Sequence, residues 1–208
     1  MEAGKVLQDF HQIKNAQFYA DGTEGTGGSG TELSEVLETI DTSIYFETIK
    51  KQAIERFWDM FVVDYLISNN DRNNTNWGVI SDGRAVKDLA PVFDNGGAFF
   101  NKRADLAFEK AMKDEKTLNE DVFQFYCVFK ENGDRIKASE FIQSNTNKDC
   151  TSAVARVLGH LNLERIQEIF NSVPAYDEGL SVLSEDKKNY LLKVIKQKVE
   201  LVLKASLN

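Results

Sequence analysis

The segment that most constrains this chain is residues 46–68, where apolar side chains recur at helical spacing on nearly every face. Ile49, Ala53, Phe57 and Tyr65 mark one stripe of the expected helix, and further apolar residues widen it around most of the circumference. A helix with so little polar surface lies inside a domain. Hydrophobic residues make up 42% of the 208 residues, which is enough to surround it with a core.

A polar cluster, SNNDRNNTN at residues 68–76, follows this helix directly and is where chemistry is expected. A polar loop mounted on a rigid, buried helix is a stable support for reactive side chains. Within the cluster, Asp71 and Asn76 have the spacing D-x-x-x-x-N. This spacing is weak by itself, because loops rich in Asn and Asp usually cap helices and form turns.

A β-hairpin is expected after the polar cluster. Residues 77–81 and 85–93 favour strands, and the Asp-Gly pair between them is typical of a hairpin turn. Because a hairpin brings its end back close to its start, Asp94 should lie beside Asp71 and Asn76.

The three side chains together suit phosphate chemistry. Two carboxylates and one amide oxygen are good ligands for Mg²⁺ carrying nucleotide phosphates. Phosphoryl transfer also needs a carboxylate that orients the acceptor hydroxyl. Asp71 would take that part, while Asn76 and Asp94 would hold the metal and, through it, the nucleotide. The same residues also allow a metal-dependent phosphohydrolase that uses Asp71 and Asp94.

The central segment resembles a known family. The run IERFWDMFVVDYLISNNDRNNTNWGVI, followed by LAPVFDNGG, is similar to the C-lobe core of the HipA-like serine/threonine kinases. The specific part of the resemblance covers residues 56–97, and a looser likeness covers most of residues 1–200. It implies a mainly α fold with a small β-hairpin, equivalent to a kinase C-lobe. Residues 1–45 would be a hinge-proximal segment, and 46–208 the helical lobe.

The resemblance also implies roles for single residues. Asp71 matches the catalytic-loop aspartate, Asn76 the metal-binding asparagine, and Asp94 the aspartate that binds metal after the strand pair. ATP and Mg²⁺ would be the cofactors, and a protein substrate would be the partner. The family often has His where this chain has Asn73. A pseudokinase-like binding module without phosphoryl transfer is therefore the alternative function.

The family fold also has an N-terminal lobe with a phosphate-covering loop and a strand lysine. This chain is expected to begin near the hinge, at Val6–Phe10, so that the N-lobe is truncated or supplied by another chain. The exposed face would then favour a homodimer or another partner. Gly25, Gly27 and Gly30 spell G-x-G-x-x-G, but an acidic, helix-favouring segment follows them, so a linker is expected there rather than a phosphate loop.

Composition argues against several other functions. The formal charge is −8, which disfavours binding to nucleic-acid backbones. The two His residues are too few for a His-rich zinc site. Cys127 and Cys150 are expected to be reduced thiols in a cytoplasmic protein, and no apolar run is long enough to span a membrane.

The remaining periodicity predicts further helices. One is expected at 32–40 with Thr31 as its N-cap. Others are expected at 119–130, 137–143, 149–160, 163–172 and 184–206.

Overall fold

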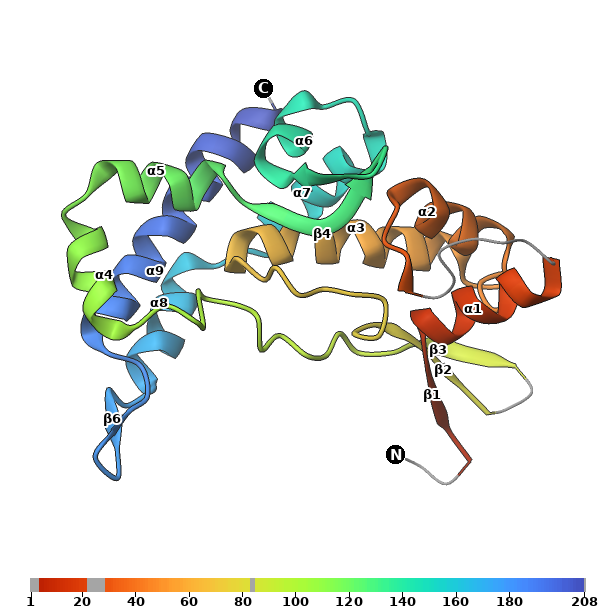
Figure 1. Ribbon diagram of the computed structural model, residues 1–208, viewed down its shortest axis with the longest axis horizontal. Coiled ribbons are helices and arrows are strands. Elements are labelled where there is room, and N and C mark those ends of the chain that lie inside the picture. The colour runs from red at the N-terminus through yellow and green to blue at the C-terminus, as the bar shows by residue number, and fades with distance from the viewer. Residues whose placement is uncertain (1–3, 22–28, 83–84, 208) are drawn as a thin grey trace.

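The structure, a computed structural model, describes residues 4–21, 29–82 and 85–207 and is mainly helical, with a buried central helix (Figure 1). That helix, α3 (Lys50–Ile67), has Phe57, Trp58 and Val62 fully buried, as its apolar circumference predicts. It begins later than expected because the chain before it forms tight turns, in which Ile49 N donates to Phe46 O. It ends at Ser68, which takes the left-handed conformation with φ 55°.

The N-terminal part contributes one strand and two helices. The segment expected to be the hinge forms β1 (Val6–Asp9), and α1 (Phe10–Asp21) follows it without a loop. The helix α2 (Leu33–Thr42) is confirmed, but its N-cap is Glu32 and not Thr31. The carbonyl of Thr31 instead accepts a hydrogen bond from Lys130 N, which draws Thr31 out of a capping position. Gly25 and Gly27 lie outside the described residues.

The expected hairpin is present and belongs to a three-stranded sheet. β2 (Gly78–Ser81) pairs antiparallel with β3 (Val86–Leu89), and β1 pairs antiparallel with the other edge of β2. The predicted turn at Gly83 and Arg84 lies outside the described residues. A Cβ at Gly78 would come within 2.1 Å of Gln8 O, so this close pairing requires glycine.

The rest of the chain is helical with two further hairpins. Its elements are α4 (Asp105–Met112), α5 (Glu115–Phe123), β4 (Tyr126–Glu131), β5 (Asp134–Lys137), α6 (Ala138–Ser144), α7 (Lys148–His160), α8 (Leu163–Ser172), β6 (Tyr176–Asp177), β7 (Leu180–Ser181) and α9 (Glu185–Lys198), which continues into the π-helical turn Val199–Leu203 and the 3₁₀ turn Ala205–Leu207. α3 packs on α7, and α9 packs on α4 and α5. No helix within the described ranges is long and apolar enough to cross a membrane.

The helix expected at 119–130 is wrong in its second half. α5 ends at Phe123, and the next residues form β4. The run Tyr126–Phe129 is β-favouring, and Asn132 and Gly133 both have positive φ, at 55° and 87°, as a tight hairpin turn needs. The fold is therefore mainly α with small antiparallel sheets, one of which contains the expected hairpin.

Candidate active site

Arg72 joins the polar loop after α3 to the segment that follows β3. Its Nη1 donates to Asn76 O at 3.1 Å, to Phe93 O, and more weakly to Asp94 O at 3.5 Å. The side chain is buried, so these hydrogen bonds form away from water. The hairpin therefore returns its end to the polar loop, which confirms the expected fold-back of the backbone.

Asp64, on α3, anchors Arg72 from the other side. Arg72 donates through Nε to Asp64 Oδ2 at 2.9 Å and through Nη2 to Oδ1 at 3.1 Å, and Asn69 Nδ2 donates to the same Oδ1 at 2.8 Å. Burial raises the pKa of Asp64 above its ordinary value, and the hydrogen bonds from Arg72 and Asn69 oppose that rise. Arg72 Nη2 also donates to Asn95 Oδ1, so one network holds both segments.

The backbone of Asp71 belongs to this network, whereas its side chain is exposed to solvent. Its carbonyl accepts from Asn73 N at 2.9 Å and from Asn76 Nδ2 at 2.8 Å. Gly97 packs directly against it, since a Cβ at that position would lie 2.8 Å from Asp71 Cβ and 2.7 Å from Asn69 Oδ1. Only glycine allows this approach of the segment after β3 to the polar loop.

Asn76 is buried, and its amide is oriented by the loop itself. Its Nδ2 is used by Asp71 O, so Oδ1 faces the other way. Thr75 Oγ1 lies 3.1 Å from Asn76 Oδ1 but 2.5 Å from Asn73 Oδ1, and its single proton favours the shorter contact. Asn76 Oδ1 therefore keeps lone pairs for another partner.

Asn73, which stands where the resembled family often has His, stabilises the local turn. Its Oδ1 also accepts from Thr75 N at 2.9 Å, which is an Asx-turn hydrogen bond. A neutral amide held this way cannot supply positive charge to a phosphate.

The side chain of Asp94 is exposed, and its backbone is left-handed with φ 54°. Such a conformation is uncommon outside glycine, although Asp tolerates it better than most residues. The described residues contain no group of three or more His, Cys, Asp or Glu side chains that could hold a metal. Asn76 and Asp94 offer oxygen donors of the kind that Mg²⁺ uses when it has few protein ligands and is shared with phosphates.

The end of the Gly-rich segment also reaches this loop. Gly30 O accepts from Asn74 Nδ2 at 2.7 Å and from Lys14 Nζ at 2.8 Å. Lys14 is fully buried and pairs with Glu35 at 2.7 Å, so its charge is already compensated. This lysine therefore serves packing between α1 and α2 rather than phosphate binding.

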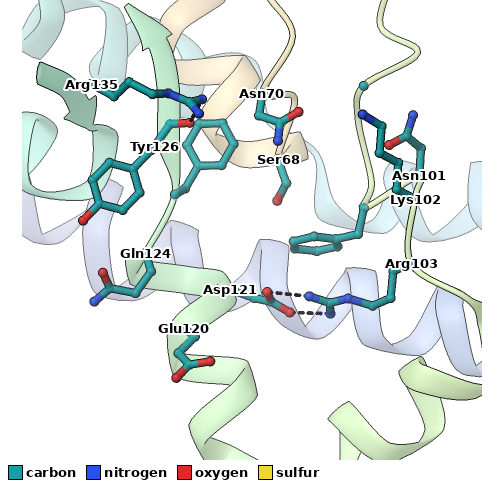
Figure 2. A pocket seen from close by; sticks show the side chains of 13 residues that line it. Ser68, Asn70, Asn101, Lys102, Arg103, Glu120, Asp121, Gln124, Tyr126 and Arg135 are labelled. Atoms are coloured by element: carbon teal, nitrogen blue, oxygen red, sulfur yellow. Dashed lines mark hydrogen bonds and ion pairs between the residues drawn. The ribbon is translucent and has the colours of Figure 1, made fainter. Parts of the chain in front are cut away.

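A cavity of about 510 Å³ opens beside the polar loop (Figure 2). Ser68, Asn70 and Gly97 line it on the loop side, and Arg103 and Asp121 form a bidentate ion pair on its wall at 2.5 and 2.7 Å. Tyr190 donates to the same Asp121 carboxylate at 2.5 Å. These contacts keep α5, α9 and the segment after β3 together around the cavity.

The cysteines take no part in the site. Cys127 and Cys150 are free and buried, and burial raises the pKa of each thiol to about 12. A thiol with so little thiolate at neutral pH is a poor nucleophile.

Arg72 and Gly97 are the site residues that sequence reasoning missed. Asp64 is the signal that could have identified Arg72, because a carboxylate in the apolar second half of the helix needs a cation that the nearby polar cluster can supply.

No family model matches the chain. A search of curated proteins finds the serine/threonine-protein kinase CtkA of Helicobacter pylori strain J99, 28% identical over 195 residues. That match covers 90% of this chain and 58% of the relative, so the chain spans under two thirds of the relative's length. The crystal structure of the H. pylori proinflammatory kinase CtkA superposes with a TM-score of 0.84 at 27% identity, covering 98% of this chain and 67% of that one. The chain is thus similar in both sequence and fold to the serine/threonine kinase CtkA.

Proposed function

We propose that this chain carries the catalytic loop of a protein serine/threonine kinase of the CtkA type. In this proposal Asp71 orients the acceptor hydroxyl, and Asn76 and Asp94 hold Mg²⁺ with its nucleotide. The similarity to CtkA supports a kinase-like function. The residue roles are our inference from the local geometry.

The observation that carries the proposal is the Arg72 network. Through the hydrogen bonds described above, Arg72 holds the loop of Asp71 and Asn76 against the backbone of Asp94. Phosphoryl transfer depends on positioning more than on covalent chemistry, so a rigid mount is what such a site needs.

The three side chains fit the division of work. Asp71 is exposed and can accept a hydrogen bond from an incoming hydroxyl. Asn76 offers an oriented amide oxygen, and Asp94 an exposed carboxylate. Mg²⁺, when bound, would neutralise charge on the transferred phosphoryl group.

We further propose that residues 1–208 alone transfer phosphate weakly. The resembled kinases cover the phosphates with a loop and a strand lysine. In the described part of this chain, the buried lysine near the Gly-rich segment is already paired with Glu35. Another segment or chain would therefore have to supply the remaining contacts to the nucleotide phosphates.

Calorimetric titration with Mg-ATP tests the nucleotide site. Wild type should bind, and Asp94→Asn should weaken binding at least about tenfold, because a carboxylate ligand to Mg²⁺ becomes a neutral amide. Asp177→Asn, an exposed carboxylate in the distant β6 strand, is the matched control and should bind like wild type. Equal binding by wild type and Asp94→Asn would refute the assigned role of Asp94.

The alternative is a pseudokinase-like module that holds a partner without phosphoryl transfer. The structural role of Asn73 favours it, because that amide supplies the turn and no charge. Absence of Mg-ATP binding in folded wild type would support the module over the kinase.

A further inference from the structure

A second cavity adjoins the cavity beside the polar loop, at the β4–β5 hairpin. The second cavity has a volume of about 520 Å³ and extends along β5 to Ser144 and Thr146. Tyr126 and Arg135 line both cavities, so the two adjoin at these side chains. We refer to the two adjoining cavities as the groove, and its first part lies beside Asp71, because Asn70 and Gly97 line it.

Two hydrogen bonds hold Arg135 at the junction of the two cavities. Its Nε donates to Cys127 O and its Nη2 to Tyr126 O, both at 2.8 Å. These bonds use two of the five N–H donors of a guanidinium, and the others remain for an occupant.

The first cavity has an excess of available positive charge. Arg103 and Asp121 neutralise each other. Glu120 also has a cation nearby, since its Oε1 lies 3.9 Å from Lys116 Nζ. In the ranges that the structure describes, neither Lys102 nor Arg135 forms an ion pair. Figure 2 shows Lys102 across the cavity from Arg135, so an occupant there would lie between two cations.

The second cavity has the opposite polarity. Lys137 is paired with Glu140 at 2.8 Å. Glu131 and Asp134 also line this cavity, and neither forms an ion pair with another described residue. The groove therefore changes from positive near the polar loop to negative at its far end.

We propose that this groove binds the acceptor segment of a protein substrate in an extended conformation. It selects an acidic side chain close to the phosphorylated hydroxyl and a basic side chain further along. This inference rests on the proposed kinase function, since it takes Asp71 as the place of the acceptor hydroxyl. Complementary charge at two separated points sets both the choice of segment and its direction.

The test measures peptide binding by fluorescence anisotropy without nucleotide. The probes are short fluorescein-labelled peptides with one Ser, made in both chain directions. One has Glu beside the Ser and Arg near the end, a second has these two exchanged, and a third has Ala at both positions. The first peptide, in one direction, should bind about tenfold more tightly than the other two.

Variants locate the binding. Arg135→Glu and Lys102→Glu should each weaken binding of the first peptide about tenfold, and Glu131→Lys should reduce its advantage over the Ala peptide. Lys110→Glu, at an exposed lysine of α4 that lines neither cavity, is the matched control and should bind as wild type does. Circular dichroism checks the fold, and if Arg135→Glu is unfolded, Lys102→Glu decides the result.

Equal binding of the three peptides, or no binding of any of them, would refute the proposal that the groove binds the acceptor segment. Equal weakening by Lys110→Glu would do the same. Selective peptide binding without Mg-ATP binding would support the groove and reject the transferase. Mg-ATP binding without selective peptide binding would reject the groove alone.

Discussion

Lys198, at the end of the last long helix, donates a hydrogen bond from Nζ to Ser68 Oγ at 2.7 Å. The same ammonium donates to Tyr65 O at 2.6 Å and lies over the Tyr65 ring, 4.6 Å from its centroid. Ser68 is the residue at which α3 ends and the polar loop begins. The C-terminal helix is therefore fastened directly to the base of the candidate catalytic loop.

This contact predicts a pH dependence of stability. Burial lowers the pKa of Lys198 from 10.5 to about 7. Between these values the unfolded chain binds a proton that the folded chain does not, so stability should rise with pH, by up to about 1.4 kcal/mol per unit. Lys198→Met should lack this rise in urea denaturation, whereas exposed Lys196→Met should keep it. A wild-type slope in Lys198→Met would contradict the assignment.

Replacing Arg72, even by lysine, should lower the free energy of unfolding. Arg72→Ala leaves Asp64 buried without its cation and should cost about 3–5 kcal/mol of unfolding free energy. Arg72→Lys keeps the charge but loses the bidentate geometry, so it should recover only part of that loss. Arg165→Lys, in an exposed pair with Glu168, should change stability by less than about 1 kcal/mol. Similar urea midpoints for Arg72→Lys and wild type would contradict the importance of the bidentate contact.

A methyl group at position 97 should disturb the loop. Gly97→Ala places Cβ too close to Asn69 and Asp71 and should cost about 1–3 kcal/mol. It should also weaken Mg-ATP binding in the calorimetric assay, because the loop has to shift. Gly159→Ala, in α7 with open space around it, is the control and should stabilise by about 0.5–1 kcal/mol. If both variants have wild-type stability, the close approach at Gly97 is not a constraint.

The thiols should be unreactive in the native protein. Cys127 and Cys150 are buried, with pKa values raised to about 12, so a colourimetric thiol reagent at pH 8 should react slowly until urea unfolds the chain. Rapid modification of either thiol under native conditions would show that its surroundings open easily. Single Cys→Ser variants identify which thiol reacts.

The parts of the fold that the sequence predicted well have strong periodicity. The circumference of α3 and the Asp-Gly hairpin signal are local, and each defines its element without tertiary contacts. By contrast, α1 buries few residues, among them Phe10, Ile13 and Lys14, so its sequence shows almost no apolar stripe. The hairpin at Asn132–Gly133 carries a readable turn signal, but the apolar spacing before it also fits a helix.

The candidate site divides in the same way. Asp71, Asn76 and Asp94 can be selected from residue type and spacing. Arg72 binds backbone carbonyls of a distant segment and Gly97 lies against side chains of the polar loop, so only the folded chain shows which atoms they meet.

The partners of Arg72 also determine which positions of the site tolerate substitution. At Phe93 and Asp94 the guanidinium binds backbone oxygens, which every amino acid provides. Related sequences could therefore drift at position 93 without loosening the anchor, while position 72 would stay fixed. A saturation library scored for folding should show that contrast, with most substitutions tolerated at position 93 and almost none at position 72.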